Sequence, residues 1–134
     1  MKGLRYLTLL ILILFILSGL VIAQETKPGF TIERLVIAGG IENREPVNVM
    51  ELVPSTTEKV YCFIEARNIQ EDTNITVVWS LNDKEVNRTT LPLKKGFRWR
   101  TYAEKNLYGM KGEWKVEILD SAGTAIKSVT FSVE

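Results

Sequence analysis

The feature that most constrains this sequence is the alternation of apolar and polar side chains in short segments. Residues 74–81 and 113–119 carry a large apolar side chain at every second position, which is the period of a β-strand with one buried face. Beyond residue 23, no segment shows the 3.6-residue apolar period of an amphipathic helix over a useful length. The sequence therefore predicts an all-β fold.

Turn residues separate the apolar segments at intervals of roughly 8–12 residues, a spacing typical of a two-sheet antiparallel sandwich. About seven strands are expected: 30–38, 59–67, 74–81, 85–93, 97–102, 113–119 and a last strand after Gly123. Residues 47–53 fit neither period and stay unassigned, and residues 103–111 are expected to form a longer connection.

Three local signals refine this arrangement. The inward parity of the first strand shifts between Ile32 and Leu35, as a β-bulge or a switch between sheets would produce. Asn82-Asp83 fits a tight hairpin turn. Pro92 lies in a more polar strand and favours an edge position for it.

The spacing of the strands is similar to that of an immunoglobulin-like sandwich. Cys62 lies where the first core cysteine of that fold lies, Trp79 follows at the place of its core tryptophan, and Trp114 lies near the place of the absent second cysteine. This analogy concerns the fold and carries no function.

Residues 1–23 have the composition of an export segment. They contain no acidic residue, place Lys2 and Arg5 before an apolar run, and end in Ala23 after a Ser-Gly break. The segment is expected to be a signal peptide, with an uncleaved membrane anchor as the alternative, because the 19 residues from Leu4 to Ile22 are nearly enough to span a bilayer core. Residues 24–29 are then a linker and residues 30–134 the sandwich domain, which lies in the periplasm or outside the cell.

Composition excludes several kinds of chemistry. The chain has no His, and one Cys can form neither an internal disulfide nor a zinc cluster. Without Lys2 and Arg5, 15 of the 17 basic residues face 16 acidic ones, a net charge near −1 that argues against nucleic-acid binding. We expect no cofactor and no metal. Cys62 is expected to be a buried free thiol, with intermolecular pairing or reactivity as alternatives.

Five segments, taken together, resemble the bacterial domain-of-unknown-function family 2914. They extend over most of residues 24–134: Gly40–Val47, Val60–Glu65, Val78–Ser80, Arg98–Tyr102 and Gly112–Glu117. The resemblance implies a small β-domain in exported or membrane-attached bacterial proteins. The family has no assigned activity, so the resemblance implies no catalytic residue.

The best candidate for a binding surface is the run Arg98–Tyr102. Period-two alternation places Phe97, Trp99 and Thr101 on one face and Arg98, Arg100 and Tyr102 on the other. Guanidinium groups suit carboxylates or phosphates, and an aromatic ring beside them suits a sugar or a peptide. The alternative is a solvated face whose arginines pair with cross-strand acids such as Glu113 or Glu117.

Three weaker candidates remain. Trp99, if it faced outward, would offer a platform for stacking a sugar ring. Glu42 and Glu45 lie close enough in sequence to flank a glycosidic bond, although pairing of Arg44 with an acid explains them equally well. Residues 71–74 carry potential calcium ligands without the spacing of a dedicated loop.

The sequence thus predicts a non-catalytic accessory domain of the cell envelope that binds a protein or a glycan through Arg98, Arg100, Tyr102 and Trp99, or along a strand edge. The alternatives are a carboxylate-dependent polysaccharide hydrolase and a structural spacer with an apolar patch. Contact with a membrane is expected only through residues 1–23, if they are not cleaved.

Overall fold

A computed structural model describes residues 27–134, which form nine strands. Their bounds are β1 (Thr31–Glu42), β2 (Glu45–Val49), β3 (Leu52–Val53), β4 (Lys59–Ile69), β5 (Thr73–Leu81), β6 (Lys84–Leu93), β7 (Gly96–Asn106), β8 (Gly112–Leu119) and β9 (Ala125–Val133). The expected export segment 1–23 and residues 24–26 of the expected linker lie outside this description. Across residues 27–134, no helix has the length and apolar character needed to cross a bilayer.

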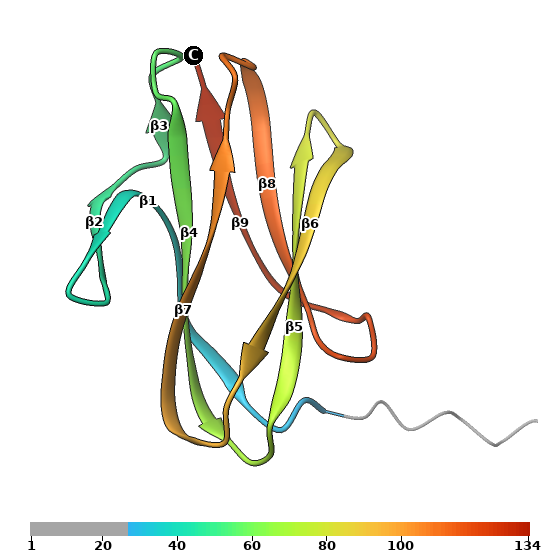
Figure 1. Cartoon of the computed structure of the whole chain (residues 1–134). Coiled ribbons are helices and arrows are strands. Elements are labelled where there is room, and N and C mark those ends of the chain that lie inside the picture. Colours follow the sequence, from blue (N-terminus) through green and yellow to red (C-terminus); the bar gives the residue numbers. More distant parts are fainter. Residues whose placement is uncertain (1–26) are drawn as a thin grey trace, which may run out of the picture.

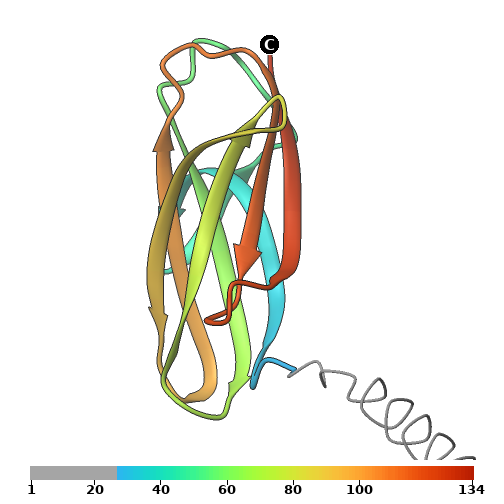
Figure 2. The same ribbon diagram turned by 90° about the vertical axis from the view of Figure 1, so that its right-hand side faces the viewer.

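The strands form two packed sheets, as expected for a sandwich (Figures 1 and 2). One sheet has the order β2-β1-β4-β7 and the other the order β3-β9-β8-β5-β6, with β3 parallel to β9. Strands β1, β4 and β7 take the places of strands A, B and E of an immunoglobulin-like sandwich, and β9, β8 and β5 those of G, F and C. The all-β sandwich is confirmed, with nine strands instead of seven. The two additional strands, β2 and β3, overlap the region that the apolar pattern left unassigned.

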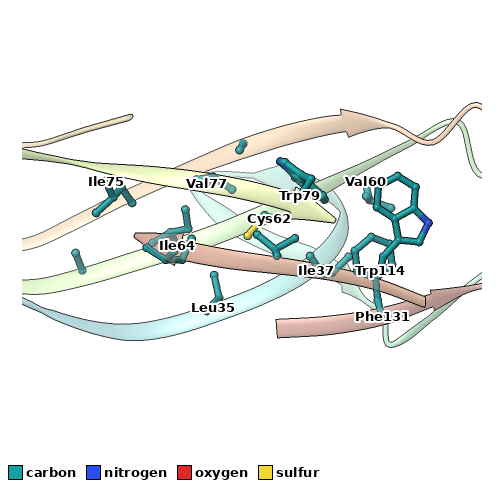
Figure 3. Packing of buried hydrophobic residues seen from close by; sticks show 14 of the residues in the cluster. Leu35, Ile37, Val60, Cys62, Ile64, Ile75, Val77, Trp79, Trp114 and Phe131 are labelled. Carbon is teal, nitrogen blue, oxygen red and sulfur yellow. The ribbon is translucent and has the colours of Figure 1, made fainter. Parts of the chain in front are cut away.

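The core lies between the sheets and includes the three residues that the sequence singled out (Figure 3). Cys62, Trp79 and Trp114 are all buried. The Phe131 ring stacks on Trp114 with centroids 5.8 Å apart and meets Trp79 edge-on at 6.3 Å. Because no disulfide is available, this aromatic contact between β5, β8 and β9 supplies much of the packing at that end of the core.

The local signals are confirmed. The β1–β4 register shifts between Ile32 and Arg34, which explains the change of parity in β1. Asn82 and Asp83 both have positive φ in the hairpin between β5 and β6. Strand β6, which contains Pro92, is an edge strand.

Strand β7 is longer than the sequence predicted, because it continues to Asn106 and does not end at residue 102. Ala103 is buried opposite Cys62 in the ladder with β4. Because the side chain of Ala103 is small, it added little to the apolar pattern, and the sequence predicted too short a strand. The connection to β8 is residues 107–111.

The hairpin β1–β2 folds back toward the outer face of its sheet, so that its turn points back toward the start of β1 (Figure 1). The bend falls at Gly39-Gly40, where the expected strand was to end. A Cβ atom on Gly39 would lie 2.8 Å from Asn48 Nδ2, and one on Gly40 would lie 3.1 Å from Val47 Cγ2. Absence of side chains at this point allows the two arms of the hairpin to lie close together.

Candidate functional site

Strand β7 turns Arg98, Arg100 and Tyr102 to the outer face of its sheet, as the alternation predicted. Their ladder partners on β4 are Arg67, Glu65 and Phe63, which share that face. Trp99 points the other way and packs, half-buried, against the core. The structure therefore separates Trp99 from the three side chains with which the sequence grouped it.

Glu65 is the buried centre of a cluster of charged side chains on this face. Its side chain is 1% exposed and accepts hydrogen bonds from three guanidinium groups. Arg34 Nη2 and Arg98 Nε both lie 3.0 Å from Oε1, and Arg67 Nε lies 3.1 Å from Oε2. Burial alone would raise the pKa of Glu65, but the hydrogen bonds from the three arginines outweigh it and lower that pKa.

Glu45, at the start of β2, shares Arg34 and Arg98 with Glu65 and also binds Arg100. Arg34 contacts both of its carboxylate oxygens, at 2.8 and 3.0 Å, and Arg100 Nη1 lies 2.6 Å from Oε1. Arg98 Nη2 is 3.3 Å from the same oxygen. The Arg34 hydrogen bonds, with a further one from Arg100, lower the pKa of Glu45 to about 2. We call these six residues the arginine cluster: Arg34, Arg67, Arg98, Arg100, Glu45 and Glu65.

The arginine cluster also explains the position of the bent hairpin. Arg34 and Glu42 are eight residues apart on β1, which is roughly 26 Å in a straight strand. The bond between Arg34 and Glu45, which is the ladder partner of Glu42, therefore requires the hairpin to fold back over the sheet. The ion pairs hold the hairpin turn against β7.

The acids that pair with the arginines are not those expected. Glu113 accepts hydrogen bonds from Ser132 Oγ, and Glu117 pairs with Lys115, both on the other sheet. The prediction that Glu113 or Glu117 balances the arginines is wrong, because β7 and β8 belong to different sheets. Neighbouring strands of the same sheet supply the carboxylates instead.

A hollow of about 510 Å³ lies between the hairpin turn and β7. Phe63 of β4 contributes to its lining, Ile41 and Arg44 line it from the hairpin, and residues 98–102 line it from β7. The Arg34 guanidinium lies 4.8 Å from the centroid of the Phe63 ring, and Tyr61 and Tyr102 pack edge to face with centroids 5.7 Å apart. The hollow is thus an apolar and aromatic concavity lined by three arginines.

The arginines of the hollow keep unused hydrogen-bond donors. Within residues 27–134, Arg44 makes no ion pair, and Arg100 uses only Nη1. A guanidinium carries five N–H donors, so both can bind a further acceptor. In the arginine cluster together with Arg44, five positive charges stand against the two negative charges of Glu45 and Glu65, an excess that favours an anion. The expected pairing of Arg44 with an acid is not seen in this part of the chain.

The remaining candidates do not form sites. Glu42 does not line the hollow, while Glu45 is held by arginines. Asp72 accepts a hydrogen bond from the Lys95 N–H at 2.8 Å, and the described residues contain no group of three acids or cysteines that could hold a metal ion. Burial raises the pKa of the Cys62 thiol to about 12, so it stays protonated.

Four residues of this face were not predicted from the sequence: Arg34, Phe63, Glu65 and Arg67. A signal for them exists, because Glu65 and Arg67 occupy every second position of an otherwise apolar strand. Charged residues at such positions indicate a polar network on the second face of the sheet. Which strand would supply their partners depends on strand order, which the pattern does not contain.

Two solved structures that the chain resembles are beta-glucosidases. The one from Listeria innocua, in complex with glucose, is 9% identical with a TM-score of 0.49, over 78% of this chain and 15% of that chain. The one from Kluyveromyces marxianus is 12% identical with a TM-score of 0.48, over 82% and 15%. The chain thus spans about 15% of the length of these enzymes. No curated protein matches it.

A family model matches residues 72–133, which include β7 and most of the lining of the hollow. Its description is "Protein of unknown function (DUF2914)". This match confirms the family that the sequence segments indicated, over the second half of the chain. Residues 72–133 of the chain are thus similar to the DUF2914 family of proteins of unknown function.

Proposed function

We propose that this protein is a non-catalytic binding module of the cell envelope that recognises a carboxylate-bearing ligand in the hollow between the β1–β2 hairpin and β7. The observation that carries the proposal is the convergence of Arg44, Arg98 and Arg100 on one aromatic concavity. Arginine forks bind carboxylates with two parallel hydrogen bonds, and the Phe63 ring offers apolar contact to the rest of the ligand.

The arginine cluster favours binding over hydrolysis. Arg34 Nη2 lies 3.0 Å from an oxygen of Glu45 and of Glu65, so these carboxylates are within about 6 Å of each other, a separation that a retaining glycosidase uses. A glycosidase needs one of its two carboxyl groups to keep a raised pKa. Both pKa values are lowered here, and both carboxylates are occupied by arginines.

A purely structural spacer is the other alternative, and it calls for a sizeable apolar patch. The exposed large apolar side chains of residues 27–134 lie on five separate elements: Val49 on β2, Leu52 on β3, Val86 on β6, Phe97 and Tyr102 on β7, and Tyr108 in the loop before β8. This scatter favours the charged hollow as the interaction site.

Export of the domain rests on residues 1–23, whose composition is that of a signal peptide or an anchor. N-terminal sequencing of the protein recovered from the envelope tests this part of the proposal. A mature N-terminus at Gln24 is expected if the segment is cleaved, and recovery of the full chain from the cytoplasm would contradict export.

Ligand binding is tested with oligogalacturonate, a carboxylated glycan, against a neutral cello-oligosaccharide, by isothermal titration calorimetry. We expect the charged probe alone to bind, with an affinity that falls as salt is raised. Arg44→Ala removes a cation from the hollow without breaking any ion pair among residues 27–134, and a loss of roughly three- to ten-fold is expected.

Lys84→Ala is the matched control, because Lys84 is also an exposed cation next to a hairpin turn and lies on β6 of the other sheet. The control is expected to bind like the wild type. Equal losses in the two variants would show a general charge effect, and binding of the neutral sugar with equal affinity would refute recognition of a carboxylate.

A further inference from the structure

The two sheets have four edge strands in the described part of the chain, and they differ in how well they are protected from further pairing. Strand β3 has two residues, and β2 has five and contains Pro46. Strand β6 contains Pro92, and its register with β5 is broken between Trp79 and Ser80. Short length, proline and bulges are three of the devices that keep an edge from accepting another strand.

Strand β7 has none of these three devices. It extends over 11 residues, contains no proline and keeps one register with β4 from Lys59 opposite Asn106 to Ile69 opposite Gly96. In the immunoglobulin-like order, the place beside strand E, which β7 occupies, belongs to strand D. No described strand fills that place, because β6 remains in the other sheet.

One hydrogen bond shows which residues of β7 point their backbone N–H and C=O groups toward β4. The Leu107 N–H donates to the Glu58 carbonyl oxygen at 2.9 Å. Successive residues of a strand point their backbone groups to opposite sides, so residues 99, 101, 103 and 105, which have the parity of Leu107, point their N–H and C=O groups toward β4. Arg98, Arg100, Tyr102 and Glu104 therefore point theirs to the open edge. The contact of Lys105 Nζ with the Asn106 carbonyl oxygen agrees with this parity, since that carbonyl faces outward too.

The same residues thus offer two kinds of recognition. Arg98 and Arg100 present free backbone groups at the edge and guanidinium groups on the outer face of the sheet. A strand added at this edge would carry every second side chain onto that face, about 7 Å apart along the strand. The arginines repeat with that same spacing.

We propose that the ligand of the hollow is an extended acidic peptide segment of a partner protein, which adds to β7 as a fifth strand and places carboxylates at alternate positions against Arg98, Arg100 and Arg44. This inference rests on the proposed function and names its partner class. Backbone pairing supplies affinity without regard to sequence, and the positive face selects acidic segments over neutral ones. The same charges discourage a second copy of β7, whose arginines would approach these.

The probe is a capped peptide of about nine residues that alternates Glu and Thr, added to the folded protein and followed by isothermal titration calorimetry. Peptides N-methylated at single positions are then compared. A strand that pairs on one side uses the N–H of every second residue, so methylation is expected to weaken binding at least about five-fold at one parity and to leave it unchanged at the other. This measurement needs no change in the protein.

Glu104→Pro tests the edge from the protein side, because proline removes an N–H that points away from β4 and pushes its ring into the place of the added strand. Glu104→Ala is the reference, since it also loses the 3.4 Å pair with Lys59 but keeps the N–H. The proline variant is expected to bind the peptide at least about five-fold more weakly than the alanine variant. Circular dichroism verifies that both are folded.

The outcomes separate the two proposals. Binding of oligogalacturonate that depends on Arg44, without alternation in the methylation series, would overturn strand addition and leave the carboxylate site in place. An affinity for the acidic peptide that is unchanged in Arg44→Ala and Arg100→Ala would overturn the acidic partner. A dimer of this chain in sedimentation equilibrium that Glu104→Pro abolishes would show that a second copy occupies the edge and would overturn the peptide.

Discussion

Glu65→Gln isolates the contribution of charge at the centre of the arginine cluster. The amide keeps the shape of the carboxylate, and one oxygen can still accept from Arg34 and Arg98. The other oxygen, which in the wild type accepts a hydrogen bond from Arg67 Nε at 3.1 Å, becomes an N–H₂ group. This group is a donor and cannot accept a hydrogen bond from Arg67. The hydrogen bond from Arg67 is therefore lost, and the hydrogen bonds from Arg34 and Arg98 become weaker because their acceptor no longer carries a negative charge.

The expected cost follows from the exposure of the partners. Removing one side of a fully buried ion pair costs about 3–5 kcal/mol, and a hydrogen bond to a charged group contributes about 1.5–3 kcal/mol. Glu65 itself is 1% exposed, but its arginines are 32–39% exposed and can turn toward water. We therefore expect the free energy of unfolding to fall by about 2–3 kcal/mol, or the Tm by about 10 °C for a domain of this size.

Urea denaturation followed by tryptophan fluorescence measures this loss, because Trp79 and Trp114 report on the core. Glu104→Gln is the control: the same substitution on the same face, at a half-exposed residue whose pair with Lys59 is expected to contribute less than about 0.5 kcal/mol. If the two variants were equally stable, the conclusion that Glu65 organises the outer face would be refuted.

The pH dependence adds an independent check. The pKa of Glu65 is lowered on folding from an ordinary value of 4.5, so its contribution is complete above about pH 4.5 and is lost as pH falls through the folded pKa. The stability difference between wild type and Glu65→Gln is expected to shrink as the solution is acidified below that pH. A difference that stays constant down to pH 2 would contradict the electrostatic origin.

Three further predictions concern the hairpin, the thiol and one turn. Glu45→Ala is expected to release the hairpin turn from β7, which would appear as faster amide exchange in residues 40–48 with little change in the core. The wild type is expected to show the same faster exchange as pH falls from 4.5 toward the Glu45 pKa of about 2. Cys62 is expected to react with a thiol reagent only in denaturant, since burial raises its pKa to about 12, and rapid labelling of the folded protein would contradict its position in the core. Gly112→Ala is expected to lower the free energy of unfolding by about 1–3 kcal/mol, because φ is +136° and the new Cβ would lie 2.6 Å from Asn82 Oδ1, whereas Gly123→Ala meets no atom within 4 Å and reports the backbone cost alone.

Arg98 belongs both to the arginine cluster around Glu65 and to the proposed binding site for an acidic strand. This side chain donates to Glu65 through Nε and to Glu45 through Nη2, so the cluster holds it in one orientation on the outer face. A guanidinium held in place loses less conformational freedom on binding than a free one. Glu65→Gln is therefore expected to weaken binding of the acidic peptide as well as stability.

The sequence by itself determined which side chains face the core. Period-two alternation placed Trp79, Trp114 and Phe131 inside and Arg98 and Arg100 outside, because the pleat of a strand turns successive side chains to opposite faces whatever its neighbours are. The hairpin at Asn82-Asp83 was equally local, since those residues tolerate positive φ.

Only the tertiary structure decided which charges meet. Glu45, Glu65 and Arg100 come from three separate strands, and their pairing depends on the order β2-β1-β4-β7 and on the fold-back of the hairpin at Gly39-Gly40. Strand order is a long-range property that alternation does not encode, which is why Glu113 and Glu117 were reasonable partners from the sequence and wrong ones in the fold. The open edge of β7 arises in the same way, because no other strand of residues 27–134 lies beside it.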